Sequence, residues 1–451
     1  MGAHSAHGHA HSQSRIAVSD RRAIRIVIAV IIPVIIGTIA AMAALWPNRD
    51  KLPDSIPITD PSAVIMYATI TTAGNSTTTD VGAVITKIPA SSAKQLQEAG
   101  EQVPAVGTEM RLYMSYEQLN VGVEPGSKAR IVYLPYAVGV DDGSGNEASP
   151  YVFLDYDRSA PIGVLAVIYA LLVLVVARWR GLAAFIGLGL SMAVLAYFTL
   201  PALLAGGPPL PIALVSSVAI MLVSLYVAHG VSVRTSAALL GTVVGLALTT
   251  GIAWWATKNA QLTGMTSDEA LSLPSYVPGL DLRGLVMCGI VLAGLGVLND
   301  VTVTQASAVW EMRELAPHAT RWQLFRGALR IGRDHIASTV YTIVFAYLGA
   351  SLPLFMLVVL QEQSIATSIT SGSIAEEVVR TLVSSIGLVL AIPITTVLAT
   401  ILAPGHQSSA PPREPSSDAP GDEPSLPSPA AGSELGDEPA PGAFDVPGWR
   451  R

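Results

Sequence analysis

The feature that most constrains this chain is a series of apolar stretches, each long enough to cross a lipid bilayer as a helix. A hydrocarbon core about 30 Å thick needs roughly 20 helical residues, and a helix satisfies its backbone hydrogen bonds within itself. The segments that meet this length are 24–46, 161–177, 181–204, 209–228, 236–256, 284–304, 337–360 and 378–402. The sequence therefore predicts a membrane all-α bundle of about eight transmembrane helices.

The composition agrees with a membrane protein. Hydrophobic residues make up 51% of the 451 residues and charged residues only 13%, which is about half the charged fraction of an average soluble protein. No basic face is concentrated enough to bind nucleic acid, so no nucleic-acid partner is expected. The single cysteine, Cys288, rules out an intrachain disulfide.

The sequence motifs of several enzyme classes are absent. The chain has no Walker A loop, dinucleotide fingerprint, nucleophile elbow, HExxH or CxxC. An intramembrane enzyme is disfavoured too, because no GxGD-like carboxylate pair and no metal-binding HExxH lie in the apolar segments. We therefore expect no enzyme activity and no cofactor.

The first apolar segment has two interpretations. Arg21, Arg22 and Arg25 precede it, and it ends in an Ala-Met-Ala sequence at 41–43 that resembles a signal-peptidase site. A cleaved signal peptide is one interpretation. The length of the apolar run favours the other, an uncleaved anchor helix over 23–46.

The basic residues predict the orientation of the chain. With the N-terminus in the cytoplasm, twelve arginines before the tail fall on the inner side and three basic residues fall in the short outer loops, as the positive-inside rule requires. The inner set is Arg15, Arg21, Arg22, Arg25, Arg178, Arg180, Arg234, Arg313, Arg321, Arg326, Arg330 and Arg333. The outer set is Lys258, Arg283 and Arg380. We expect a protein of the cell inner (plasma) membrane, held in the lipid bilayer, with both termini cytoplasmic.

Residues 47–160 then lie outside the membrane and are rich in predicted strands. Turn residues separate the candidates, notably at 124–127 and 141–146. The candidate strands are 63–72, 81–88, 108–114, 129–136 and 151–156, with one helix at 91–99. This pattern predicts a small extracytoplasmic β-rich domain, a barrel of the OB kind or a sandwich. With no metal-ligand spacing or catalytic triad in it, the domain is expected to be structural or to bind protein partners.

The remaining domain, 161–402, is predicted to hold seven membrane helices and one long inner loop. In that loop, 305–336, tryptophans and arginines mix with leucines. This mixture predicts an amphipathic segment of one or two helices at the headgroup level. A solvated connector is the alternative.

Both ends of the chain are predicted to be disordered. The tail, 403–451, holds eleven prolines and eight acidic residues. Four histidines crowd the head, 1–22, namely His4, His7, His9 and His11. Imidazoles this close can bind Zn²⁺, Cu²⁺ or Ni²⁺, but a disordered tract supplies no geometry or selectivity. A solvated tract without a metal is the alternative.

Polar side chains stand at the end of the sixth apolar segment. Asn299 and Asp300 lie about 22–24 Å from Gly284 at 1.5 Å per residue, still within the hydrocarbon. One helical face carries Gly289, Gly296, Asp300, Thr304, Ser307 and Glu311. Because a carboxylate facing lipid costs several kcal/mol, we expect this stripe to turn inward and contact a substrate or ion. The alternative is that Asn299 and Asp300 mark the helix end and cap the next segment.

A second polar group opens the seventh segment. Arg333, Asp334, His335 and Ser338 enter from the side where Asp300 leaves, so these residues are expected to meet near one depth. A histidine beside carboxylates can relay protons near neutral pH. The alternative is that Asp334 caps the helix while its neighbours lie at the membrane interface.

The last two segments each contain a proline, Pro353 and Pro393. Proline removes a helical hydrogen bond and frees carbonyls nearby, and paired broken helices are typical of transporter sites. An ordinary kink is the alternative. Gly241 and Gly245 form a GxxxG, which is expected to pack against another helix.

Several long motifs resemble a known family. They are YVFLDYDR (151–158), HGVSVRTSAALLGT (229–242), GVLNDVTVTQASAVWEM (296–312), IGRDHIASTVYT (331–342) and AYLGASLPL (346–354). Over roughly 60–402 the chain resembles the YibE/F-like family of bacterial membrane proteins, whose activity is not settled. The resemblance implies a multi-pass bundle with an outer domain fused to its front. It marks as the family's signature, without assigning roles, Asn299, Asp300, Thr302, Gln305, Glu311, Arg333, Asp334, His335 and Ser338.

Two functional classes remain open. The preferred hypothesis is a transporter or permease for a small solute or ion, with a pathway lined by Asn299, Asp300, Thr304, Arg333, Asp334, His335 and Ser338. The alternative is a non-transporting membrane scaffold that recruits partners through the outer domain and the tail. The sequence does not identify the substrate or the oligomeric state.

Overall fold

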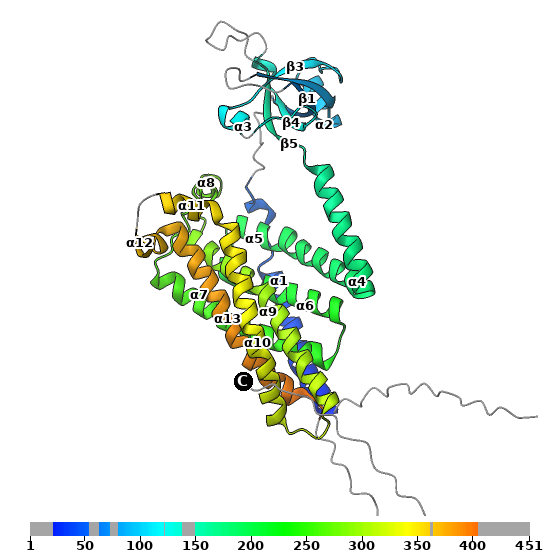
Figure 1. Ribbon diagram of the computed structural model, residues 1–451, viewed down its shortest axis with the longest axis vertical. Helices are drawn as coiled ribbons and strands as arrows, with labels where there is room; N and C mark the ends of the chain where they lie inside the picture. Colours follow the sequence, from blue (N-terminus) through cyan, green and yellow to red (C-terminus); the bar gives the residue numbers. More distant parts are fainter. Residues whose placement is uncertain are drawn as a thin grey trace, which may run out of the picture. The chain divides into compact units, whose positions relative to one another are not determined.

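The computed structural model (Figure 1) describes residues 21–53, 63–72, 80–120, 122–137, 149–360 and 364–404. The histidines predicted as weak metal ligands (His4, His7, His9 and His11) lie outside these residues. So does the tail from 405 onward, and with it the second of the two compact units of the chain, Gln407–Arg451. The described elements belong to a β domain and a set of membrane-type helices.

Five strands follow the first helix, in the order that the sequence predicts. They are β1 (Val64–Thr72), β2 (Asp80–Lys87), β3 (Glu109–Tyr113), β4 (Lys128–Tyr133) and β5 (Tyr151–Tyr156). They close into a barrel in the order β1-β2-β3-β5-β4, with β1 and β4 antiparallel and β3 and β5 parallel. The prediction of a small β-rich domain is confirmed, and the barrel replaces the sandwich.

The barrel encloses its own apolar core. Along β1 the residues at 64, 66, 68 and 70 are buried while those between them are half-buried, which is the alternation of a strand with one inward face. Ile85 and Leu112 reach the same core from β2 and β3. The connecting elements are short: η1 (Arg49–Lys51), α2 (Ala90–Glu98), α3 (Tyr116–Asn120) and η2 (Pro135–Ala137).

The rest of the described chain is helical. The elements are α1 (Arg21–Ala44), α4 (Ser159–Val194), η3 (Leu195–Thr199), α5 (Leu200–Leu204), α6 (Pro209–His229), α7 (Val233–Asn259), α8 (Asp268–Tyr276), α9 (Leu282–Leu315), α10 (Arg321–Ala350), α11 (Leu352–Leu360), α12 (Ile365–Ile369) and α13 (Gly372–Leu402). Among the described residues, six helices are long and apolar enough to cross a membrane, or up to seven if the bent pair α10–α11 is one span. The chain is an integral membrane protein.

Two of the eight predicted segments lie in one 46-residue run, Ser159–Leu204. The run is broken at Arg178, whose φ of 54° and ψ of −130° are not helical. Just after the break a Cβ on Gly181 would lie 2.8 Å from the carbonyl oxygen of Val173, so the chain turns back closely on itself there. Because the two predicted segments 161–177 and 181–204 form this one run, the structure has fewer candidate spans than the eight predicted from the sequence.

The inner loop predicted at 305–336 is not a separate amphipathic element. Its first part continues α9 to Leu315, and its last part belongs to α10, which begins at Arg321. Only a short turn lies between them, and the buried Arg313 holds it by donating to the carbonyls of Pro317 and Ala319 at 3.2 and 2.8 Å. The two helices predicted for this range are present as the ends of α9 and α10, because the sequence contains no helix breaker before this turn and α9 runs on.

The two prolines behave differently. The chain bends by 68° between α10 and α11, so the break predicted at Pro353 is confirmed. α13 continues through Pro393 as one helix, so the break predicted there is wrong. Tertiary packing holds this helix, since Ala391, Ile392 and Thr395 around the proline are fully buried.

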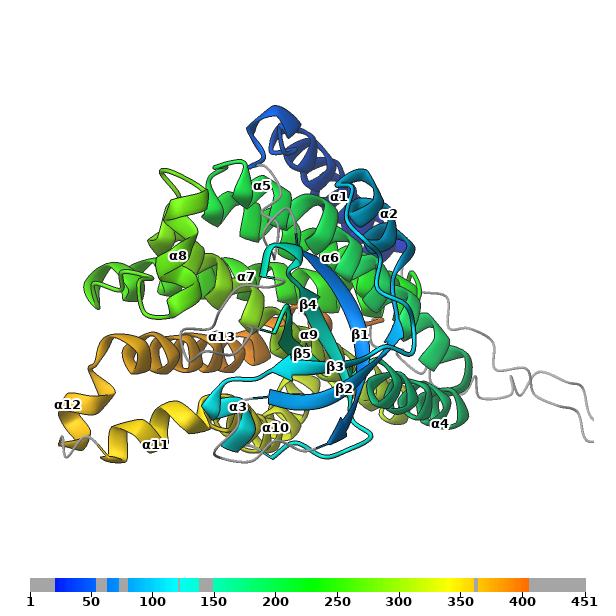
Figure 2. The same cartoon turned by 90° about the horizontal axis from the view of Figure 1, so that it is seen from above.

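The most extensive helix packing joins α7, α9 and α13 (Figure 2). Small residues permit it, as the GxxxG pattern predicts: Gly241 faces Thr395 of α13, and Gly245 faces Ala391 of α13 and Leu298 of α9. In the same way Gly387 of α13 faces Thr249. Because glycine has no Cβ, two helix backbones can approach each other closely at these positions.

Candidate functional site

The site begins with an acid and a base on neighbouring helices. Nε2 of His335 on α10 lies 3.8 Å from Oδ2 of Asp300 on α9. The two residues are nearly equidistant from the turn at 316–320, so the antiparallel register of α9 and α10 places them at one level. The predicted meeting of Asp300 and His335 is confirmed.

The exposure of this pair differs from the prediction. The Asp300 side chain is 72% exposed and that of His335 is 29% exposed. Gly296, Thr304 and Glu311 on the same stripe are exposed as well, so the expectation that the stripe turns inward is wrong for a single chain.

A different face of α9 is buried instead. Thr302 shares a hydrogen bond of 2.6 Å with Thr242 of α7. Gln305 donates to the carbonyl of Ala328 on α10 at 2.7 Å. Both residues belong to the motif that resembles the family, and sequence reasoning assigned them no place.

The remaining predicted site residues differ in their exposure and in their hydrogen bonds. Asn299 is half-buried, and its Oδ1 has no hydrogen-bond partner in the described part of the chain. Thr304 and Ser338 bond to backbone within their own helices, at the carbonyls of residues 300 and 335. Arg333 and Asp334 are exposed, and no ion pair joins either to another described residue. The structure thus brings together Asp300 and His335, without the two charges that precede the histidine.

Both capping alternatives are wrong. Asn299 and Asp300 do not end a helix, because α9 continues for fifteen further residues to Leu315. Asp334 does not begin one, because α10 starts at Arg321. Its N-cap is Thr320, which forms a capping box with Gln323.

A second ion pair lies on α13, where the sequence suggested only an outer-loop charge. Nε of Arg380 is 3.5 Å from Oε2 of Glu377, and the two side chains are 28% and 22% exposed. Arg380 also approaches α9, where its Nη1 lies 3.6 Å from a Cβ placed on Gly289. Tyr347 of α10 is within the electrostatic reach of both charges. A signal was available, since Glu376, Glu377 and Arg380 share the first turns before an apolar run.

The neighbouring Glu376 has a structural task. It is 7% exposed, and its carboxylate accepts from the backbone N–H of Gly264 at 3.0 Å and from the hydroxyl of Thr266 at 2.7 Å. Gly264 has a φ of +75°, a conformation that a glycine adopts without strain. Glu376 therefore ties the loop after α7 to the start of α13.

One buried hydroxyl, that of Ser384 on α13, lies between the levels of the two ion pairs. Ser384 faces Gly294 of α9, with its Oγ 3.6 Å from the position of a Cβ there. The Oγ of Thr395 is buried without a hydrogen-bond partner among the residues described. Ionisable pairs at two levels, with a buried hydroxyl between them, are groups that can pass a proton or coordinate a small polar species. In the same residues, no group of three or more His, Cys, Asp or Glu could hold a metal ion.

Comparison with known proteins gives one match. The family described as YibE/F-like protein matches residues 165–405, which include both ion pairs. The match begins after the barrel. The resemblance predicted from the sequence begins near residue 60 and includes the motif at 151–158, so the match does not cover its first part. No curated protein and no solved structure matches the chain.

Proposed function

The chain belongs to the YibE/F-like family of multi-pass membrane proteins, and we propose that it is a transporter or permease for a small solute or ion. The observation that supports this most is the Asp300–His335 pair, which joins two long helices of the family domain at 3.8 Å. Proton-linked carriers use histidines beside carboxylates at membrane depth.

The Glu377–Arg380 pair supports the proposal as a second ionisable site along the same helices. It lies where α13 faces α9 and α10, the same two helices that hold Asp300 and His335. A pathway along this three-helix interface would have ionisable groups at both ends and the buried hydroxyl of Ser384 in between. In the orientation that the arginines favour, with both termini cytoplasmic, Asp300 and His335 form the inner end.

The test is flux through the full-length protein in proteoliposomes. Gradients of Na⁺, K⁺, Mg²⁺ and phosphate are imposed one at a time, while charge movement is recorded on a supported membrane and internal pH with a trapped dye. We expect a flux that is lost in Asp300→Asn and in His335→Gln. The matched control is Asp334→Asn, the same chemical change one residue from His335, in a side chain that no ion pair joins to the described residues; it should keep the flux.

Folding of each variant is checked through the one cysteine, Cys288, which is 2% exposed and should resist a thiol-reactive dye until the helices separate. Flux that persists unchanged in both pair variants contradicts the assigned site. A folded wild-type protein that moves nothing under any of the gradients contradicts transport itself.

A scaffold is the second candidate, and one observation favours it. Tyr113, Tyr116 and Tyr136 of the barrel domain are 45%, 54% and 58% exposed, and tyrosine is enriched where proteins meet. If the chain is a scaffold, replacing these three tyrosines by serine should abolish its function in cells, while Asp300→Asn should leave that function intact. Transport predicts the reverse.

A further inference from the structure

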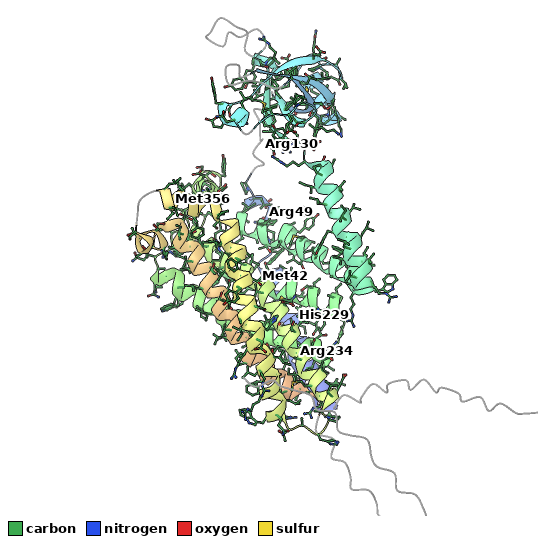
Figure 3. The ribbon with its side chains drawn as sticks, in the orientation of Figure 1. Met42, Arg49, Arg130, His229, Arg234 and Met356 are labelled. Carbon is green, nitrogen blue, oxygen red and sulfur yellow. The ribbon has the colours of Figure 1, made fainter. Side chains whose placement is uncertain are left out.

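A small pocket that no member of the two ion pairs lines lies where α6 ends and α7 begins. Its walls come from α6, α7 and α9, and it is small and open to solvent. The polar groups that line it are His229, Arg234, Thr235 and Ser307. Figure 3 shows His229 and Arg234 at neighbouring positions on the two helices that the loop 230–232 connects. The other lining side chains are alanine and valine.

The charge at this pocket is positive and uncompensated. No carboxylate lines it. Arg234 is half-buried, yet neither an ion pair nor a side-chain hydrogen bond joins it to any residue that the structure describes. The charged groups that act on His229 are Arg234 and Arg180, the latter from the bend of α4. A half-buried guanidinium without a partner loses part of its hydration, and an anion can replace it with charge-assisted hydrogen bonds.

The backbone favours an anion at the same place. Arg234 and Thr235 lie in the first turn of α7, a helix of 27 residues. The positive end of a helix dipole and the N–H groups of its first turn attract negative charge. Ser232 caps only the N–H of Thr235, so other donors of this turn remain for a ligand.

The surroundings are suited to a lipid. Trp179 beside Arg180 and Val231 in the loop are 82% and 86% exposed, so apolar side chains flank the cations. Basic pockets between membrane helices bind the headgroups of anionic lipids. We propose that this pocket binds a phosphate group, carried by an anionic phospholipid or present as free phosphate. Neither Asp300 nor His335 lines this pocket, and the proposal holds whether or not the chain transports.

The experiment measures binding to the full-length protein in neutral detergent by native mass spectrometry and by thermal unfolding. One arm adds phosphatidylglycerol, with phosphatidylcholine as the zwitterionic reference. The other arm adds inorganic phosphate, with chloride as the reference. We expect retention of at least one phosphate carrier and a higher melting temperature, both of which weaken as NaCl rises. Retention of the glycerolipid alone identifies a headgroup site, and an effect of inorganic phosphate alone identifies a soluble anion.

Variants then locate the binding. Arg234→Gln should weaken it by about tenfold or more, the loss expected for one charge-assisted hydrogen bond. His229→Gln changes an exposed side chain and supplies a second variant should Arg234→Gln not fold. Arg326→Gln, which removes the same charge from an exposed position on α10, is the control and should bind as wild type. Equal retention of the two lipids with no effect of phosphate overturns the proposal, as does binding that Arg234→Gln, His229→Gln and Arg326→Gln all leave unchanged.

Discussion

Replacing Gly241 by alanine should destabilise the helical domain, because its Cα faces a side chain of α13 directly. A Cβ there would lie 2.9 Å from both Cβ and Cγ2 of Thr395, and it would also collide with the Oγ1 of that residue. Thr395 is fully buried, so it has no free space to move into. Overpacking of this kind typically costs about 1–3 kcal/mol.

The matched control is Gly251→Ala, on the same helix. A Cβ at 251 would meet no atom within 4 Å. Both substitutions gain the same helix propensity, roughly 0.5–1 kcal/mol, so this gain cancels when the two variants are compared. The difference between them, about 1–3 kcal/mol, is the cost of the contact with Thr395.

The assay uses the cysteine that the chain already carries. Cys288 is the sole cysteine of the sequence and is buried in α9, so labelling by a thiol-reactive dye during heating reports the separation of the helices. At about 2–4 °C per kcal/mol, Gly241→Ala should melt roughly 2–12 °C below Gly251→Ala. Thr395→Ala, which removes two of the three colliding atoms, should partly restore the double variant. Equal melting of the two glycine variants would refute the close approach of α7 and α13.

Two further predictions concern the outer loop and the barrel. Glu376→Gln should weaken the anchoring of 264–266 by about 1–3 kcal/mol, since the buried carboxylate loses its charge and one acceptor. Amide hydrogen exchange in this loop should therefore become faster. The control Glu269→Gln, at an exposed position, should leave the exchange unchanged. The pKa of Asp155 is lowered in the folded protein, chiefly by the hydrogen bond from Arg158. The ionised carboxylate therefore stabilises the folded barrel at pH values above the pKa that Asp155 has in the unfolded chain. This stabilisation is lost as the pH falls through the lowered pKa. Exchange protection of the strands should therefore fall on acidification below about pH 4, and less so in Asp155→Asn; the same acid response in both would contradict this role.

The elements that depend on local pattern were predictable from the sequence. The strand predicted at 63–72 is β1 at Val64–Thr72, and the helix predicted at 91–99 is α2 at Ala90–Glu98. Alternating burial fixes a strand within its own residues, and turn residues fix its ends. The apolar segments were found for the same reason, because hydrocarbon requires an unbroken run of about 20 residues.

The features that depend on neighbouring helices were not predictable in the same way. The exposed stripe with Asp300 and the buried face with Thr302 both carry small and polar residues, so composition does not show which face turns inward. The partners decide it: Thr242 and the carbonyl of Ala328 meet the second face. The sequence predicts a loop charge at Arg380, because its partner Glu377 and the facing Gly289 become relevant only once α13 packs against α9.

The exposure of Asp300 follows from the level at which the pair lies. α9 has 34 residues, about 51 Å at 1.5 Å per residue, whereas the hydrocarbon is about 30 Å thick, so part of this helix must project beyond it. On α10 the arginines extend from Arg321 to Arg333, and the apolar run begins directly after His335. Because arginines avoid the hydrocarbon, its boundary falls near His335. Asp300, at the same level across the hairpin, can then be hydrated while its partner is covered, which is the arrangement that the proposed pathway requires at its mouth.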